Sequence, residues 1–261
     1  LVPARPAPGP ADPPPDHLPY TVLSCSISLD GYISSATGDR LILSNDADFD
    51  RVDAVRAGCD AIMVGAATIR NDDPRLLVRS PQRIAARTAR GMPPAPVKVT
   101  VTERAKLDPA AAFFATGQDK LVYCSSDVLA DAHRMLDGVA TVVDGGRPVR
   151  MRRVSADLHR RGIRRLMVEG GGTVHTQFLV EDLADELHLV VAPVFVGDSR
   201  ARRFVDDGCF PWHPERRGSL AEVRQIGDVV LLRYALSERF RADALDIGRA
   251  DPSDIGGVVP R

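Results

Sequence analysis

The sequence predicts an α/β domain built on a largely parallel sheet with helices on both faces. Short apolar runs alternate with helix-like segments over most of the 261 residues, as expected for strands joined by helical crossovers. Hydrophobic residues make up 44% of the chain, which is enough for a full core. Only Gly227-Asp228 separates the last two strand-like runs. These two runs are therefore expected to form an antiparallel hairpin at the sheet edge.

Hydrophobic periodicity defines the individual elements. The expected strands are Tyr20–Ser28, Ala61–Val64, Val97–Thr102, Lys120–Cys124, Ala140–Val143, Arg165–Val168, Glu186–Ala192, Glu222–Ile226 and Val229–Tyr234. The expected helices are Asp46–Ala57, Ser126–Leu136, Val149–Arg161 and Thr173–Leu183. The first helix follows Ser44 and Asn45, which are common capping residues, and ends before Gly58. The Arg- and Pro-rich segment Pro81–Pro96 is expected to be an exposed loop.

Both ends of the chain are expected to lie outside this single domain, which spans residues 20–240. Residues 1–19 contain eight prolines and few large apolar side chains, so they predict a disordered, extended arm. Residues 241–261 are also poor in large apolar residues and are interpreted as a loose tail.

Composition and spacing exclude several classes of function. The formal net charge is −1, which gives no general attraction to nucleic acid or to anionic lipid. No apolar run approaches the roughly 18 residues that a membrane span needs. The four cysteines lack C-x-x-C spacing and the histidines lack ligand spacing, so we expect reduced thiols, no metal and a cytoplasmic protein. His175 is interpreted as a surface or packing histidine.

The segment Val168–Thr173 is the strongest functional signal, because three glycines join a buried strand to a helix. Gly170, Gly171 and Gly172 allow the backbone to approach a ligand closely, and the helix start attracts anions. Glu169 stands beside this anion site and would repel a phosphate, so a sugar hydroxyl or a ring nitrogen is its more natural partner. The alternative is a tight turn whose glycines serve only helix–sheet packing.

A second small-residue turn follows the strand that ends at Val64. Gly65 leaves room at the strand end, Thr68 offers a hydroxyl, and Asp72 or Asp73 offers a carboxylate. Arg75 and Arg79 add guanidinium groups that suit a phosphate. The alternative is an ordinary polar loop with an Asx turn at Asp73-Pro74.

A third polar strand end is Ser28-Leu29-Asp30-Gly31. Asp30 either faces a ligand or belongs to a simple turn. Two glycine-lined strand ends, one with an acid beside it, predict a dinucleotide and a small polar substrate in one crevice. The pattern is not the compact G-x-G-x-x-G of a Rossmann unit, and neither a zinc-deaminase signature nor a G-x-S-x-G elbow is present.

These residues together resemble the pyrimidine reductase family of riboflavin biosynthesis, over roughly residues 20–234. The matching motifs are Ser28-Leu29-Asp30-Gly31, Gly65-x-x-Thr68-x-x-x-Asp72-Asp73-Pro74-Arg75-Leu76, Glu169-Gly170-Gly171-Gly172-Thr173, Leu183-x-Asp185-Glu186 and Ala192-Pro193-x-x-x-Gly197. The resemblance implies a three-layer, dihydrofolate-reductase-like fold, a homodimer, no metal, and NADPH as hydride donor. It implies that the ribosyl group of an aminopyrimidine ribosyl 5′-phosphate is reduced to ribityl.

The resemblance also assigns roles by position. Catalytic roles fall on Asp30, Asp72 and Glu169, and the proton donor is left open among Asp72, Glu169 and an ordered water. Cofactor contacts fall on Gly65, Thr68, Asp72, Gly170, Gly171, Gly172 and Thr173. Substrate contacts fall on Ser28, Asp30, Arg56, Arg79 and Glu169, with the two arginines holding the phosphate.

The chain departs from the bifunctional bacterial members on the substrate side. It has Ser24 where they carry a lysine and Tyr32 where a basic residue is usual, and segment 40–44 lacks their Ser-x-Trp-like element. It therefore looks closer to the stand-alone reductases, which accept the 2,5-diamino compound. Two alternatives remain: a reductase of the same fold that acts on a pterin, dihydrofolate or secondary metabolite, and a nucleotide-binding protein without turnover.

Overall fold

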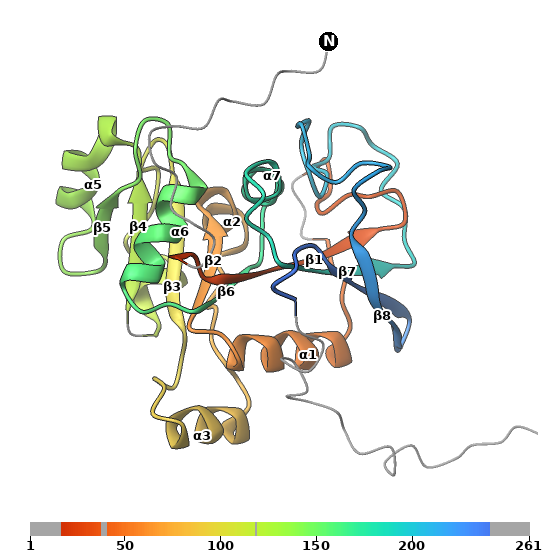
Figure 1. Cartoon of the computed structure of the whole chain (residues 1–261). Coiled ribbons are helices and arrows are strands. Elements are labelled where there is room, and N and C mark those ends of the chain that lie inside the picture. The colour runs from red at the N-terminus through yellow and green to blue at the C-terminus, as the bar shows by residue number, and fades with distance from the viewer. Residues whose placement is uncertain (1–16, 38–40, 118, 241–261) are drawn as a thin grey trace, which may run out of the picture.

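The computed structural model describes residues 17–37, 41–117 and 119–240. A sheet of nine strands crosses this part of the chain in the order β5-β4-β3-β2-β6-β1-β7-β9-β8 (Figure 1). The strands pair in parallel from β5 to β7, whereas β9 pairs antiparallel with both β7 and β8. The predicted parallel sheet with an antiparallel C-terminal hairpin is confirmed.

The strands match the predicted runs closely. They are β1 (Tyr20–Ser28), β2 (Ala61–Gly65), β3 (Val97–Thr102), β4 (Lys120–Cys124), β5 (Thr141–Asp144), β6 (Arg165–Val168), β7 (Glu186–Ala192), β8 (Ser219–Ile226) and β9 (Val229–Ala235). The largest shift is in β8, which begins three residues before its predicted start. A register irregularity between Leu220 and Glu222 interrupts its alternation there.

The four predicted helices are present, three of them with shifted ends. The helices are α1 (Asp46–Ala57), α2 (Ala66–Asp72), α3 (Pro81–Ala89), α4 (Ala112–Ala115), α5 (Leu129–Met135), α6 (Met151–Arg160) and α7 (Gly172–Val180), with a 3₁₀ turn, η2, at Ser126–Val128. The α1 bounds agree with the prediction, and the Asn45 side chain caps this helix by accepting from the Asp48 N–H.

The segment Pro81–Pro96 was expected to be a loop, and this expectation is wrong, because α3 occupies its first half. Ser80 caps α3 by accepting from the Arg83 N–H, and Pro81 occupies its first turn. Pro fits the first helical turn because that position needs no N–H donor. The Ser80-Pro81 pair was therefore the helix-start signal in this segment.

Helices cover both faces of the sheet and bury two main clusters. One cluster packs α6 and α7 against β1, β3 and β6, with Phe178 and Leu158 at its centre. The other packs α1, α2 and α5 against the opposite face, with Ile62 and Met167 between them. Leu18, which falls inside the predicted arm, is buried in the first cluster. The remainder of that arm, residues 1–16, and the tail 241–261 lie outside the described residues.

Neither a membrane span nor a metal centre is found in the part of the chain that the structure describes. Its helices are too short or too polar to cross a bilayer. Its His, Cys, Asp and Glu side chains form no group of three or more that could hold a metal ion.

Candidate active site

A cavity of about 1080 Å³ lies at the carboxyl ends of the central parallel strands. This edge is where open α/β sheets place their ligands. Six of the residues assigned to the site from the sequence line the cavity: Gly65, Thr68, Asp72, Gly171, Gly172 and Thr173. Ser28, Asp30, Arg56, Arg79, Glu169 and Gly170 are not among the lining residues.

The two glycine turns are joined directly, although they are about a hundred residues apart in the sequence. The Gly65 N–H donates to the Gly170 carbonyl at 2.9 Å, because β2 and β6 are neighbours in the sheet. A Cβ at Gly65 would lie 3.0 Å from the Val174 side chain. The peptide bond between Gly170 and Gly171 is cis. The turns therefore form one continuous backbone surface at the cavity wall.

Two helices begin at this surface without a side-chain cap. Gly65 is the N-cap of α2 and Gly171 is the N-cap of α7, and neither has a side chain that could accept from the first N–H groups. Unpaired N–H groups and the positive end of a helix dipole favour an anion. The arrangement suits the phosphates of a nucleotide.

The start of α7 is held from outside by the segment after β7. A Cβ at Gly172 would lie only 2.5 Å from the Arg203 carbonyl oxygen, so no larger residue fits there without movement. The Thr173 hydroxyl donates to Asp206 at 2.8 Å, and the Thr176 hydroxyl accepts from the Asp206 N–H at 2.8 Å. We call residues 194–206 the strap. Arg200 and Arg202 of the strap line the cavity.

Asp30 fixes the other end of the strap. Its carboxylate accepts from the Gly197 N–H at 2.7 Å and the Val196 N–H at 3.1 Å. The Ser28 hydroxyl donates to the same carboxylate at 2.5 Å and accepts from the Tyr32 N–H at 2.9 Å. The Ser28 hydrogen bond, supported by the two backbone donors, lowers the pKa of Asp30 to about 2. In the structure, Asp30 therefore holds the strap in place through these hydrogen bonds, and Ser28 orients the Asp30 carboxylate.

Glu169 and Arg56 form a bidentate ion pair with both N···O distances at 2.6 Å. Their side chains are only 13% and 16% exposed, respectively. Burial opposes the charge on Arg56, but the charge of Glu169 and its hydrogen bonds outweigh it and raise the Arg56 pKa. Arg56 also donates to the Leu77 carbonyl at 3.3 Å. The acid beside the glycine turn is therefore paired with the arginine that was assigned to the phosphate.

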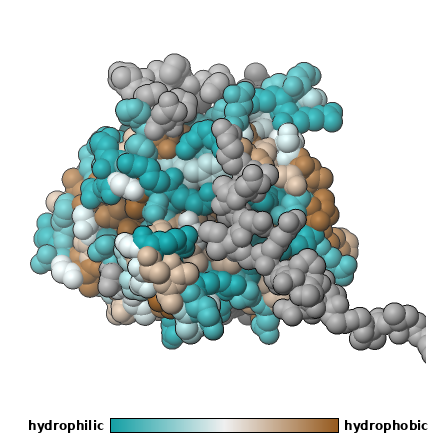
Figure 2. Space-filling model, turned by 60° about the horizontal axis from the view of Figure 1, so that its bottom comes forward, coloured by the Kyte–Doolittle hydropathy of each residue, from teal (hydrophilic) through white to brown (hydrophobic). Residues whose placement is uncertain are grey.

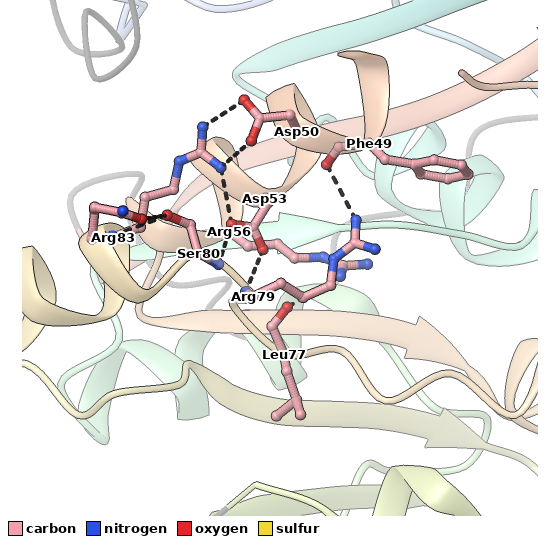
Figure 3. Close-up of polar contacts among 9 residues, drawn as sticks. Phe49, Asp50, Asp53, Arg56, Leu77, Arg79, Ser80 and Arg83 are labelled. Carbon is pink, nitrogen blue, oxygen red and sulfur yellow. Dashed lines mark hydrogen bonds and ion pairs between the residues drawn. The ribbon is translucent and has the colours of Figure 1, made fainter. Parts of the chain in front are cut away.

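A second polar network ties the segment before α3 to α1 (Figure 3). Asp53 accepts from the Arg79 N–H at 2.6 Å and the Ser80 N–H at 3.2 Å, and Arg83 bridges Asp53 and Asp50. The Arg79 guanidinium lies 5.8 Å from the centre of the Phe49 ring. Phe49 lines the cavity, so Arg79 stands behind one wall of the cavity.

Several residues that line the cavity were not assigned to the site from the sequence. They include Ser26, Ser44, Phe49, Arg104, Lys106, Arg200 and Arg202. Ser26 and Ser44 hydrogen-bond to each other at 2.9 Å, which joins β1 to the residue before the α1 cap. Ser26 lies in β1, Phe49 lies in α1 and the others come from loops, none of them in a motif, so only the approach of their segments in the fold brings them together. His175, interpreted as a surface or packing residue, is fully buried in α7.

Comparison with known proteins identifies the family. The RibD C-terminal domain family matches residues 19–232 of the chain. A 2,5-diamino-6-ribosylamino-4(3H)-pyrimidinone 5′-phosphate reductase from Archaeoglobus fulgidus is 33% identical over 223 residues, covering 85% of this chain and 98% of that protein. A protein of the same name from Methanothermobacter thermautotrophicus is 34% identical over 220 residues, covering 84% and 98%.

Solved structures agree with the sequence comparison. RibD from Acinetobacter baumannii superposes with a TM-score of 0.68 at 26% identity, covering 84% of this chain and 58% of that chain. A pyrimidine reductase-like protein from Corynebacterium diphtheriae shares the fold with a TM-score of 0.72 at 21% identity, covering 83% and 91%. The chain therefore belongs to the RibD C-terminal domain family and has the dihydrofolate-reductase-like fold of the riboflavin-biosynthesis reductases.

Proposed function

We propose that this protein is an NADPH-dependent reductase that converts the ribosyl group of an aminopyrimidine ribosyl 5′-phosphate to ribityl. The observation that carries the proposal is the joined pair of glycine turns, Gly65 and Gly170–Gly172, at a cavity next to two uncapped helix starts. The relatives named as reductases of such a compound supply the substrate class. Among these compounds we favour the 2,5-diamino one that their names specify.

The cavity fits a dinucleotide in size and chemistry. Its volume of about 1080 Å³ is slightly above the ~300–1,000 Å³ that small-molecule sites occupy, so it has room for a coenzyme and a second ligand. Gly171, Gly172 and Thr173 would hold the diphosphate through backbone N–H groups, Gly65 would allow its close approach, and Thr68 would add a hydroxyl. When bound, NADPH supplies the hydride that reaches the C1′ carbon of the ring-opened imine.

The protein's own residues position the acceptor and supply the proton. Reduction of a C=N bond adds a hydride at carbon and a proton at nitrogen, so one group near the imine nitrogen must donate a proton. Asp72 lines the cavity, whereas Glu169, which pairs with Arg56, is not among the lining residues. We therefore assign proton transfer to Asp72, directly or through a water, and assign to Glu169 and Arg56 the shaping of the adjacent sugar site.

Arg79 is proposed to contact the substrate phosphate. It is an exposed residue whose guanidinium lies against the ring of Phe49, which lines the cavity. Arg79→Ala should then raise the substrate KM far more than the cofactor KM, because the substitution removes a contact that only the substrate makes. Equal effects on the two KM values would refute the assignment.

Coenzyme oxidation tests the proposed function. The protein is incubated with NADPH and, in separate reactions, with the 2,5-diamino ribosyl phosphate, its deaminated counterpart, and dihydrofolate, while the nicotinamide absorbance is followed. Oxidation with a ribosyl phosphate and formation of the ribityl product support the proposal. Oxidation with dihydrofolate alone, or tight NADPH binding without any oxidation, overturns it.

We also propose that the reaction takes place in the cytoplasm.

Two copies of the chain are proposed to associate. The outer face of the hairpin and of β7 carries apolar side chains in adjacent register, at Leu189, Val191, Val223, Val230 and Leu232. We call these residues the open apolar face. Val223 is 60% exposed and Val230 is 37% exposed. Figure 2 shows hydrophobic residues gathered at the right edge, the side on which Figure 1 places β8. A two-fold axis through this face would bury it against itself.

A further inference from the structure

Asn45 joins the start of α1 to the turn of the C-terminal hairpin. Its side-chain Oδ1 accepts from the Asp48 N–H at 2.9 Å, which caps the helix. Its Nδ2 donates to the Ile226 carbonyl at 2.7 Å and to the Asp228 carboxylate at 2.7 Å. Both polar ends of the amide are therefore used, one for the helix and one for a turn that begins 181 residues later in the sequence.

The hairpin turn has the shape to receive this side chain. A Cβ at Gly227 would lie only 2.7 Å from the Asn45 Nδ2, so a larger residue would displace the amide. The backbone of Gly227 also has a positive φ of 62°, which glycine adopts without steric strain. Leu43 is buried on the same hairpin, in a cluster with Ile226 and Leu231. The chain before α1 therefore has both an apolar and a polar contact with the hairpin.

Residues of the cavity stand on both sides of Asn45 in the sequence. Ser44, directly before it, lines the cavity and hydrogen-bonds to Ser26 of β1 at 2.9 Å. Phe49, one helical turn after it, also lines the cavity, and its N–H donates to the Asn45 carbonyl at 2.9 Å. We call Ser26, Ser44 and Phe49 the β1 wall of the cavity. The position of Asn45 therefore sets the position of two members of this wall.

We infer that Asn45 is a positioning residue for the substrate, because it sets the first turn of α1 against the hairpin and so places the β1 wall. The inference rests on the proposed function, in which the substrate phosphate contacts Arg79, whose guanidinium packs on the Phe49 ring of that wall. The next turn of α1 is held separately, since the Arg51 Nη1 lies 3.2 Å from the His188 Nδ1 of β7. Loss of the Asn45 contacts should therefore shift the first turn and leave the helix folded.

Asn45→Asp separates the two roles of this side chain. A carboxylate keeps the helix cap, because Asp and Asn cap helices about equally well, but it cannot donate to Ile226 and it repels Asp228. Steady-state kinetics gives one KM for the 2,5-diamino ribosyl phosphate and one for NADPH. We expect the substrate KM to rise about tenfold, because two hydrogen bonds that position the β1 wall are lost. The NADPH KM should stay unchanged, because NADPH is assigned to the glycine turns after β2 and β6.

Asp228→Asn is the matched control and, in combination, the rescue. On its own it keeps an amide oxygen that accepts from the Asn45 Nδ2, so both KM values should stay unchanged. Combined with Asn45→Asp it supplies an amide N–H that donates to the carboxylate at position 45, so the substrate KM should return most of the way to its wild-type value. An unchanged substrate KM in Asn45→Asp, an equal rise in both KM values, or a double variant without recovery overturns the inference.

Hydrogen–deuterium exchange tests the same contact without any substrate and separates it from the proposed function. Exchange in residues 41–49 should be faster in Asn45→Asp than in the wild type and should slow again in the double variant. That pattern in a chain that reduces no ribosyl phosphate would support the placing of the β1 wall by Asn45 and refute the reductase. A working reductase whose exchange and substrate KM are both unaffected by Asn45→Asp would refute the positioning role and leave the reductase intact.

Discussion

Gly172 illustrates how a single missing side chain shapes the site. It is the first residue of α7, and the Arg203 carbonyl occupies the space where a Cβ would lie. This contact brings the strap against the helix start, next to the wall that would hold phosphates.

Gly172→Ala should destabilise the protein. In a helix this change ordinarily stabilises, by about 0.5–1 kcal/mol, but overpacking against a backbone carbonyl costs about 1–3 kcal/mol. Urea denaturation measures the free energy of unfolding. Thr173→Ala is the control on the next residue, since it removes the Asp206 hydrogen bond without adding an atom, and it should cost about 1 kcal/mol. A stabilised Gly172→Ala protein would contradict the close approach.

His175 should make stability depend on pH. Burial lowers the pKa of His175 from 6.5 to about 4, so between these values the folded protein binds fewer protons than the unfolded chain. The stabilisation is complete above pH 6.5 and is lost as the pH falls through about 4, by roughly 3 kcal/mol. The measurement is the free energy of unfolding of wild type and His175→Gln across this range. The wild type should lose more stability than the variant on acidification; parallel curves would show that His175 is not the cause.

At the scale of elements, α1 and α3 act as a pair that positions the wall around Phe49 and Arg79. Asp53 of α1 accepts from two backbone N–H groups at the start of α3, and Arg87 of α3 donates to the Ala57 and Cys59 carbonyls at the end of α1. Each helix therefore satisfies polar groups that the other would leave unpaired.

Asp53→Asn should loosen this pair. Asp53 is 3% exposed at its side chain and carries three hydrogen-bonded partners, so loss of its charge should cost about 1–3 kcal/mol. Asp50→Asn is the matched control, because Asp50 binds the same Arg83 but is 66% exposed. It should cost at most about 1 kcal/mol. Thermal denaturation compares the two, and equal costs would show that burial of the Asp53 network contributes nothing.

At the scale of the whole molecule, the open apolar face predicts the assembly. Val223→Lys places a charge in that face and should convert a dimer to monomers, because an unpaired charge cannot be buried without a large cost. Sedimentation velocity gives the oligomeric state. Ala85→Lys, on an exposed position of α3, adds the same charge elsewhere and should leave the dimer intact. A wild-type chain that sediments as a monomer would refute the proposed association.

Local sequence patterns were enough to predict the sheet, its C-terminal hairpin and the two glycine turns. Those features depend on local patterns, because apolar runs mark buried strands and a two-residue connection allows only a hairpin. The same local logic predicted that Gly65, Thr68, Gly171 and either Asp72 or Asp73 line one crevice, since parallel strands end at one edge of the sheet. The Ser80-Pro81 pair also indicated the start of α3, although the surrounding arginines and prolines favoured a loop.

Which polar side chains pair with one another depends instead on the folded arrangement of the chain. Asp30 and Ser28 brace the strap, and Glu169 is bound to Arg56, because segments more than a hundred residues apart meet at these points. The same folding brings Arg104 and Arg202, from different loops, to the lining of one cavity. A side chain's residue type indicates which partners it favours, but the partner it has depends on contacts between distant segments, which no local pattern encodes.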